Sequence, residues 1–201
     1  MTKDSIIKST LKGLNNARRN YDKWIGGECC RIPEYVNTVE IAREVTRNEN
    51  IYTSLEENPQ ETIKTLKGEM RGRKSELSRL DGRFDIVVWN TRRPIGIIEV
   101  KKTQHGSVEI NKDAERIFSV LDKADKLTWG LIAYSMLIYD GVRKPGISSL
   151  NERTENIKNK VNELAENRGF QVARYKSNAK FFGEGTEWSA AWRAEVLEIR
   201  K

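Results

Sequence analysis

Hydrophobic residues recur at helical spacing near the N-terminus. Residues 4–25 place apolar side chains three and four positions apart, which predicts an amphipathic helix ended by Gly26 and Gly27. A second such pattern spans residues 33–47 and opens with Pro33, a residue that suits the first turn of a helix. The side chains expected on the apolar stripes are Ile6, Ile7, Leu11, Leu14, Ala17 and Tyr21 in the first helix, and Tyr35, Val36, Val39 and Ala42 in the second.

Two short apolar runs follow in the stretch RFDIVVWNTRRPIGIIEVKK, residues 83–102. IVVW and IGIIEV are rich in β-branched residues, and the break from Asn90 to Pro94 between them predicts a β-hairpin. The remaining pattern predicts strands over 51–55, 129–140, 170–175 and 190–199, and helices over 60–67, 111–125 and 149–167. This order predicts an α/β fold with a mixed central sheet flanked by helices.

The chain has 201 residues, enough for one domain with a substantial core, and residues 1–30 are expected to be a helical extension of that domain. Lys and Arg number 36 against 29 Asp and Glu, a formal charge of +7, which favours nucleic acid as a partner and an acidic membrane surface second. Two adjacent cysteines and one histidine cannot supply the four ligands of a structural zinc site. Without a signal-like N-terminus or a run of about eighteen apolar residues, we expect a cytoplasmic protein without a membrane partner.

The hairpin has acidic residues at its open end. If Trp89 pairs with Ile95, antiparallel register places Asp85 directly opposite Glu99, with Cβ atoms about 5 Å apart. Lys101 lies two residues beyond Glu99, so both side chains share one face of the sheet. Opposed carboxylates repel unless a proton or cation lies between them, and a divalent metal that prefers oxygen ligands, such as Mg²⁺, is the simplest solution. A register slip of one residue would send the two acids to opposite faces.

The hairpin carries the residues RFD, then a spacer of thirteen residues, then EVK. This arrangement resembles the motif of the PD-(D/E)xK nuclease superfamily. Phe84 precedes the acid where the superfamily motif has proline, a departure that leaves the carboxylate in place. The resemblance spans roughly residues 33–140, and its specificity comes from the strand context of the motif. It implies a restriction-endonuclease-like core, hydrolysis of DNA, and Mg²⁺ as the cofactor with Mn²⁺ as a substitute.

The resemblance also assigns roles to the motif residues. Asp85 and Glu99 would hold the metal, with the backbone carbonyl of Val100 as a further ligand. Lys101 would orient the attacking water or stabilise negative charge that develops on the phosphate. Because the two acids should keep Lys101 protonated, we do not expect it to act as a free general base.

A further metal ligand often comes from the preceding helix in such nucleases. Glu40 is the candidate here, because it lies beside Val36 at the border of the apolar stripe and could reach the sheet edge. A surface pair with Arg43, three residues later, would explain Glu40 equally well. Glu56, at the end of the strand predicted over 51–55, is the competing candidate.

Basic side chains gather before the hairpin and in its turn. Near a phosphodiester they would make sequence-independent contacts to the backbone, although such runs are often only solvated faces. Gln104 could contact a phosphate or form its own turn, and Arg116 could pair with Asp113 or reach the scissile phosphate. The residues assigned to nucleic-acid contact are Arg71, Arg73, Lys74, Arg92, Arg93, Gln104 and Arg116.

Together these features predict a metal-dependent phosphodiesterase that acts on nucleic acid, with DNA as the expected substrate. A catalytically silent module that binds nucleic acid or protein on the same scaffold is an alternative, and so is a ribonuclease. A homodimer is compatible with cutting both strands of a duplex. All five tryptophans are expected in the core.

Overall fold

The structure is a computed structural model that describes residues 3–27, 32–65, 82–91, 93–102, 108–124, 126–139, 146–183 and 189–201. Its helices are α1 (Lys3–Ile25), α2 (Glu34–Thr46), α3 (Pro59–Thr65), α4 (Val108–Lys123) and α5 (Gly146–Glu166). Its strands are β1 (Ile51–Glu57), β2 (Phe84–Asn90), β3 (Pro94–Val100), β4 (Trp129–Tyr139), β5 (Gln171–Lys176), β6 (Lys180–Phe182) and β7 (Ala190–Arg200). The predicted elements are confirmed with small shifts of their ends, and β6 is the strand that the sequence pattern missed.

The strands form one mixed seven-stranded sheet in the order β1-β2-β3-β4-β7-β5, with β6 also paired to β7. β3 and β4 run parallel, and the other paired strands are antiparallel. A parallel pair needs a crossover connection, and α4 supplies it between β3 and β4. The predicted α/β class with a mixed sheet is therefore confirmed.

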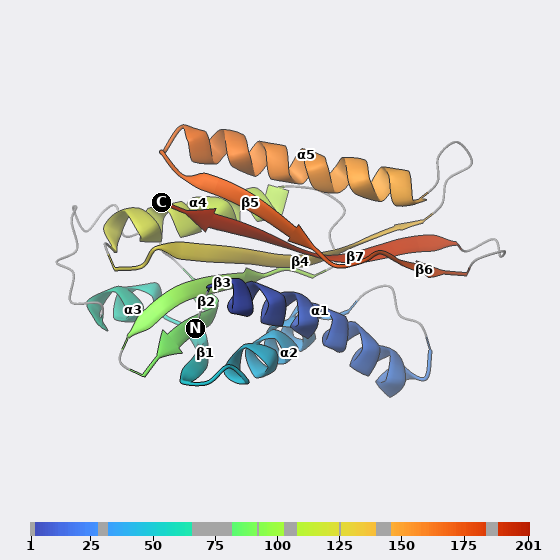
Figure 1. The fold of residues 1–201 in the computed structure, drawn as a ribbon, viewed down its shortest axis with the longest axis horizontal. Coiled ribbons are helices and arrows are strands. Elements are labelled where there is room, and N and C mark those ends of the chain that lie inside the picture. Colours follow the sequence, from blue (N-terminus) through green and yellow to red (C-terminus); the bar gives the residue numbers. More distant parts are fainter. Residues whose placement is uncertain are drawn as a thin grey trace.

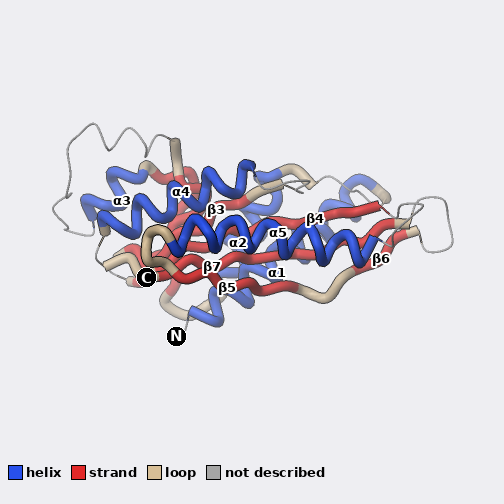
Figure 2. Tube along the Cα trace, turned by 90° about the horizontal axis from the view of Figure 1, so that it is seen from above, coloured by secondary structure: helices blue, strands red, loops and turns tan. Residues whose placement is uncertain are grey.

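Helices cover both faces of the sheet (Figure 1). α1 and α2 cover one face, α4 and α5 cover the other, and α5 runs along the length of the sheet when seen from above (Figure 2). Side chains of the hairpin alternate between two apolar clusters as the strand period requires. Ile86, Val88, Ile98 and Val100 belong to the cluster under α1 and α2, and Val87 and Ile97 to the cluster under α4 and α5.

α1 is part of this core rather than a loose appendage. Ile6, Ile7 and Leu14 are buried in the cluster between α1, α2 and the sheet. At Gly13 the backbones of the two helices come so close that a Cβ atom would lie 2.5 Å from the Ile41 Cα. Glycine at this position therefore sets the distance between α1 and α2.

The apolar stripe of α2 differs from the predicted one. Tyr35 and Val39 are 69% and 50% exposed, whereas Val36, Ile41 and Val45 are buried. The prediction was wrong at Tyr35 and Val39 because the close approach of α1 turns α2 so that these two positions face away from the sheet.

The tryptophans also divide between core and surface. Trp129 and Trp192 are buried, and Trp89 is half-buried. Trp24 is 66% exposed because the last turns of α1 lead away from the sheet (Figure 1), so the core prediction was wrong for this residue. Trp188 lies outside the described residues. None of the helices in the described ranges could cross a lipid bilayer, since they are too short or too polar.

Glu44 links α1 to α2 through charged contacts. Lys12 Nζ lies 2.9 Å from Glu44 Oε2, Asn16 Nδ2 donates to Oε1 at 2.9 Å, and Arg47 contacts the same oxygen. Burial pushes the pKa of Glu44 up, but Lys12 and Arg47 outweigh it and hold that pKa below its ordinary value of 4.5.

We expect Glu44→Gln to lower the free energy of unfolding by about 1 kcal/mol at pH 7, because Lys12 and Arg47 are more than half exposed and screened by solvent. A depressed carboxyl pKa stabilises the fold above the unfolded pKa, and this contribution is lost as the pH falls through the folded value. Urea denaturation should therefore show a smaller difference between wild type and variant at about pH 3 than at pH 7. An equal difference at both pH values would contradict the role of charge; Glu163→Gln, on the exposed side of α5, is the control.

Candidate functional site

The β-hairpin of β2 and β3 has the predicted register over most of its length. Residues 86–88 pair with residues 96–98 as expected. Close to the turn, Trp89 pairs with Pro94 instead of the predicted Ile95, because the register shifts between Val88 and Trp89. This irregularity lies at the turn, and the last printed pair towards the open end, Ile86 with Ile98, keeps the predicted register.

Carried one pair further, this register places Asp85 opposite Glu99. Glu99 is fully buried and Asp85 is half-buried. The backbone N–H of Val100 donates a hydrogen bond of 2.6 Å to Asp85 Oδ2, which fixes one oxygen of this carboxylate. Glu99 faces α4, where Arg116 contacts it, and the like charge of Asp85 acts on Glu99.

Lys101 comes next on the same face. Its backbone N–H donates to the carbonyl oxygen of Ala133 at 2.9 Å, so the pairing with β4 continues one residue past the end of β3. Its Nζ atom lies 3.2 Å from Asp113 Oδ2 on α4, and its side chain is only 15% exposed. The structure thus holds Lys101 between the end of the strand and the helix.

Arg116, one helical turn beyond Asp113, reaches the buried acid of β3. Its Nη2 atom contacts Glu99 Oε2 and lies 3.5 Å from Asp113 Oδ1. The predicted pair of Arg116 with Asp113 is therefore present, and its contact with a scissile phosphate stays a prediction. The other carboxylate oxygen, Glu99 Oε1, is buried without a hydrogen-bond partner among the described residues.

Glu34 is a site residue that the sequence analysis missed. It lies at the first position of α2, and its Oε2 accepts a 3.0 Å hydrogen bond from the backbone N–H of Lys102. This contact ties the start of α2 to the end of β3. An acid in the first turn of a helix is favourable for the helix dipole alone, so the sequence carried no separate signal for it. We call Glu34, Asp85, Glu99, Lys101, Asp113 and Arg116 the β3-end cluster.

The two acids considered from sequence as further ligands, Glu40 and Glu56, lie in different places. Glu40 accepts a hydrogen bond of 2.9 Å from Asn20 on α1 and lies 3.8 Å from Arg43, so its carboxylate faces the contact between α1 and α2. Glu40 is therefore not the acid that α2 brings to the cluster. Glu56 lies in β1 between Leu55, paired with Ile86, and Glu57, paired with Phe84; it is exposed and has a positive φ of 54°.

Burial dominates the electrostatics of Glu99. Removal from water raises the pKa of Glu99 well above its ordinary value, Arg116 opposes this shift, and the like charges of Asp85 and Asp113 add to it. Burial also raises the pKa of Asp113, against the lowering effect of Lys101 and Arg116. The protein thus holds these carboxylates at the cost of desolvation, and a further positive charge would favour their ionised forms.

Lys101 is kept cationic. Burial alone would lower the pKa of Lys101, but the charges of Asp113, Glu34 and Asp85 outweigh it and raise that pKa. A protonated Nζ atom can donate hydrogen bonds and stabilise negative charge. It cannot accept a proton, which agrees with the role expected from the sequence.

An open groove of about 530 Å³ leads to this cluster from solvent. It lies at the end of β3, between the first residue of α2 and the N-terminal part of α4. Its described lining residues are Glu34, Lys101, Lys102, Glu109, Lys112 and Asp113. The ammonium groups of Lys101, Lys102 and Lys112 lie beside the acids and attract an anionic substrate to the groove.

The predicted nucleic-acid contacts are only partly placed. Arg93 is exposed in the turn between β2 and β3, and it sits at the opposite end of β3 from Glu99, about 20 Å of extended chain away. Arg93 therefore cannot contact a phosphate held at the cluster, although a long duplex could bridge both positions. Arg71, Arg73, Lys74, Arg92 and Gln104 lie outside the described residues.

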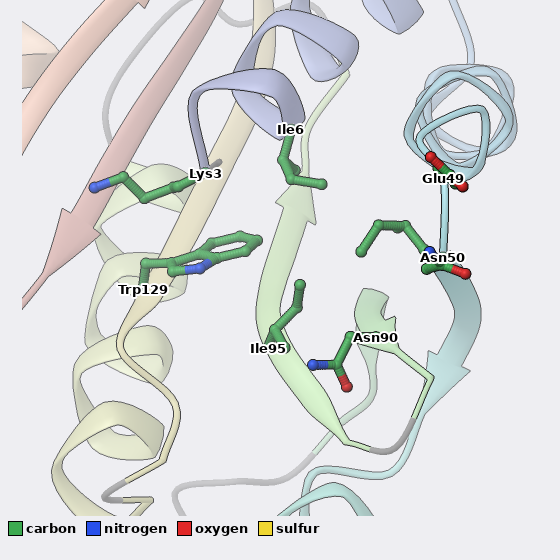
Figure 3. Close-up of a pocket in the computed structure, with 8 residues that line it drawn as sticks. Lys3, Ile6, Glu49, Asn50, Asn90, Ile95 and Trp129 are labelled. Carbon is green, nitrogen blue, oxygen red and sulfur yellow. The ribbon is translucent and has the colours of Figure 1, made fainter. Parts of the chain in front are cut away.

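A second hollow of about 390 Å³ lies near the turn end of the hairpin (Figure 3). Ile6, Ile95 and Trp129 give it apolar walls, and the ammonium of Lys3 points away from it to pair with Glu198. Its other polar lining side chains are amides and one exposed carboxylate, so it offers no pair of acids for hydrolysis.

The donor chemistry of the β3-end cluster suits Mg²⁺. No group of three or more His, Cys, Asp or Glu side chains in the described ranges is arranged to hold a metal. Mg²⁺, however, commonly takes only one or two protein carboxylates and completes its shell with water and phosphate oxygens. The unpartnered, buried Glu99 Oε1 fits such a ligand, because a buried carboxylate oxygen without a partner is costly.

The chain matches no family model, no curated protein and no solved structure. Fold and site together define an α/β protein with a mixed seven-stranded sheet and a partly buried cluster of acids and cations at the end of β3. A narrower assignment has to rest on the chemistry of that cluster.

Proposed function

We propose that the protein is a Mg²⁺-dependent nuclease that hydrolyses phosphodiester bonds, with DNA as the expected substrate, and that the β3-end cluster is its active site. The observation that carries the proposal is the proximity of Asp85, Glu99 and Lys101 at the end of β3, with Lys101 in the lining of a solvent-open groove. The restriction-endonuclease-like core, implied by resemblance, belongs to the same proposal.

Asp85 and Glu99 would hold the metal, with the Val100 carbonyl as a further ligand and Mn²⁺ as a substitute for Mg²⁺. The bound cation supplies Lewis-acid charge at the phosphate and lowers the pKa of a water ligand. The N–H of Val100 holds Asp85 in orientation by donating to Oδ2, which leaves Oδ1 for a ligand.

Lys101 is the residue that stabilises the negative charge developing on the phosphate. Its ammonium keeps its proton, is held near Asp113, and lines the groove where a phosphate would lie. A positive charge fixed in advance lowers the barrier most where the transition state gains negative charge. Lys101 also orients the attacking water by donating a hydrogen bond to it.

Lys102 and Lys112 line the groove outside the cluster and would contact phosphates along the strand. Such contacts are independent of sequence and weaken steeply with salt. They do not distinguish DNA from RNA, so a ribonuclease of the same design stays an alternative.

A silent binding module is the second candidate, and one observation favours it. Arg116 already supplies Glu99 with a positive partner, so the cluster has an internal cation at one of its two proposed metal ligands. A scaffold that had lost metal chemistry could keep this ion pair and the basic groove.

The test is a cleavage panel with purified protein on supercoiled plasmid, linear duplex, single-stranded DNA and RNA, each with Mg²⁺, Mn²⁺ or EDTA. We expect metal-dependent cleavage of DNA that Asp85→Asn abolishes and that the exposed control Glu163→Gln preserves. Cleavage of RNA alone would identify a ribonuclease. Binding in a gel shift without cleavage of any substrate would support the silent module instead.

A further inference from the structure

Arg116 holds its two acidic partners through a single nitrogen. Nη2 contacts Glu99 Oε2 and lies 3.5 Å from Asp113 Oδ1, while Nε is buried without a hydrogen-bond partner among the described residues. A guanidinium that grips a carboxylate through two nitrogens is held more tightly and in one orientation. The contact of Arg116 is therefore the kind that another cation could replace.

The guanidinium is packed on one side and reaches solvent on another. Nη1 packs beside Gly82, where an added Cβ would lie only 3.1 Å away, so the guanidinium fills the place that a side chain there would need. Asp113, one turn back along α4, lines the open groove, and the Arg116 side chain is 19% exposed. Because the side chain is partly exposed and lies one helical turn from Asp113, a change of its side-chain rotamer could carry the guanidinium from Glu99 towards the groove without movement of α4.

The charge balance of the cluster points to a divalent partner. Within the β3-end cluster four acids, Glu34, Asp85, Glu99 and Asp113, face two cations, Lys101 and Arg116, a formal charge of −2 when all are ionised. The neighbouring groove residues Lys102, Lys112 and Glu109 add +1. A divalent cation would offset the negative charge of the cluster. It would also lie close to the guanidinium if Arg116 kept its contact with Glu99, and the two cations would repel each other.

We propose that Arg116 is an internal counter-ion that occupies Glu99 until a divalent metal binds, and that metal binding releases the guanidinium towards the groove and its phosphate-bearing strand. The inference rests on the proposed function, because it concerns the same metal site. In the metal-free protein, Arg116 neutralises the charge of Glu99. Once a metal is bound, Arg116 contacts the phosphates of the substrate. This exchange also explains why a buried acid pairs with a side chain on the groove side of α4.

The test measures metal binding directly, without nucleic acid. Mn²⁺ titrations followed by calorimetry and by the electron paramagnetic resonance signal of free Mn²⁺ would compare wild type, Arg116→Gln and Arg116→Met. We expect both variants to bind Mn²⁺ about tenfold more tightly than wild type, since no internal cation competes, and Arg116→Lys to stay near wild type. Arg43→Gln, which removes an exposed arginine that pairs with Glu40, should leave the affinity unchanged.

Thermal unfolding provides a second measurement. Without metal, Arg116→Gln should melt below wild type because Glu99 loses its partner, and Mn²⁺ should raise its melting temperature by more than that of wild type. Arg116→Met keeps a side chain of similar length, so it serves if the glutamine variant does not fold.

Two results would overturn the inference in different ways. Equal or weaker Mn²⁺ binding by both neutral variants, with metal-dependent cleavage by wild type, would make Arg116 a fixed part of the site and leave the proposed function standing. No Mn²⁺ binding by wild type or variants, together with no cleavage in the substrate panel, would remove the proposed function as well.

Discussion

Lys101→Met should reduce the single-turnover rate of DNA cleavage by about 100- to 1,000-fold at saturating Mg²⁺, the loss typical for one preorganised charge donor in an active site. The methionine keeps much of the aliphatic length of lysine but removes the ammonium that Asp113 holds at 3.2 Å. The lost charge acts on the transition state, so affinity for DNA should change far less than the rate. Quenched-flow cleavage and a binding titration in Ca²⁺ would separate the two effects.

The matched control is Lys160→Met, which removes an exposed lysine on α5, on another part of the surface. It should cleave at the rate of wild type. If Lys101→Met also cleaves at that rate, Lys101 has no catalytic role and the mechanism is wrong. If it loses DNA affinity and rate by the same factor, Lys101 serves to bind substrate rather than to stabilise the transition state.

Local patterns were sufficient to predict most of the fold. The apolar runs of the hairpin and of β4, and the helical spacing in α1 and α4, reflect a period that each segment carries by itself. β6 was not predicted because its three residues, Lys180 to Phe182, are too few to show a period. The register shift at Trp89 was not predicted either, because it depends on how the chain leaves the turn. The exposed face of α2 could not be predicted because the partner helix decides it through the contact of Gly13 with Ile41.

Some features of the candidate site could likewise be predicted from local patterns, whereas others depend on how distant elements pack. The register of residues 86–88 with 96–98 and the shared face of Glu99 and Lys101 follow from the strand period, so both could be deduced before any coordinates. Glu34 could not, because its position depends on where the start of α2 meets the end of β3. From the sequence Arg116 was expected to pair with Asp113 or to reach the scissile phosphate, and only the packing of α4 on the sheet brings it to Glu99.

Glu99→Gln should lower the cleavage rate by at least about 1,000-fold, because the amide loses the negative charge that holds the metal. Its effect on stability should be small and of either sign, within about 1 kcal/mol, although it removes a fully buried charge from an ion pair. Burial disfavours the ionised carboxylate of Glu99, and this cost offsets much of the attraction to Arg116. The amide oxygen can still accept from Nη2 of Arg116, and the neutral group costs less to keep out of water.

Urea denaturation without metal, at the pH of the cleavage assay, measures this balance, with Glu163→Gln as the exposed control. A variant that is inactive but as stable as wild type would mean that Glu99 is kept for chemistry, since the fold gains nothing from its charge. A loss of several kcal/mol would instead make Glu99 and Arg116 a structural ion pair, because removal of one partner from such a pair is strongly destabilising. Cleavage and stability together therefore distinguish an active site from a silent scaffold at one residue.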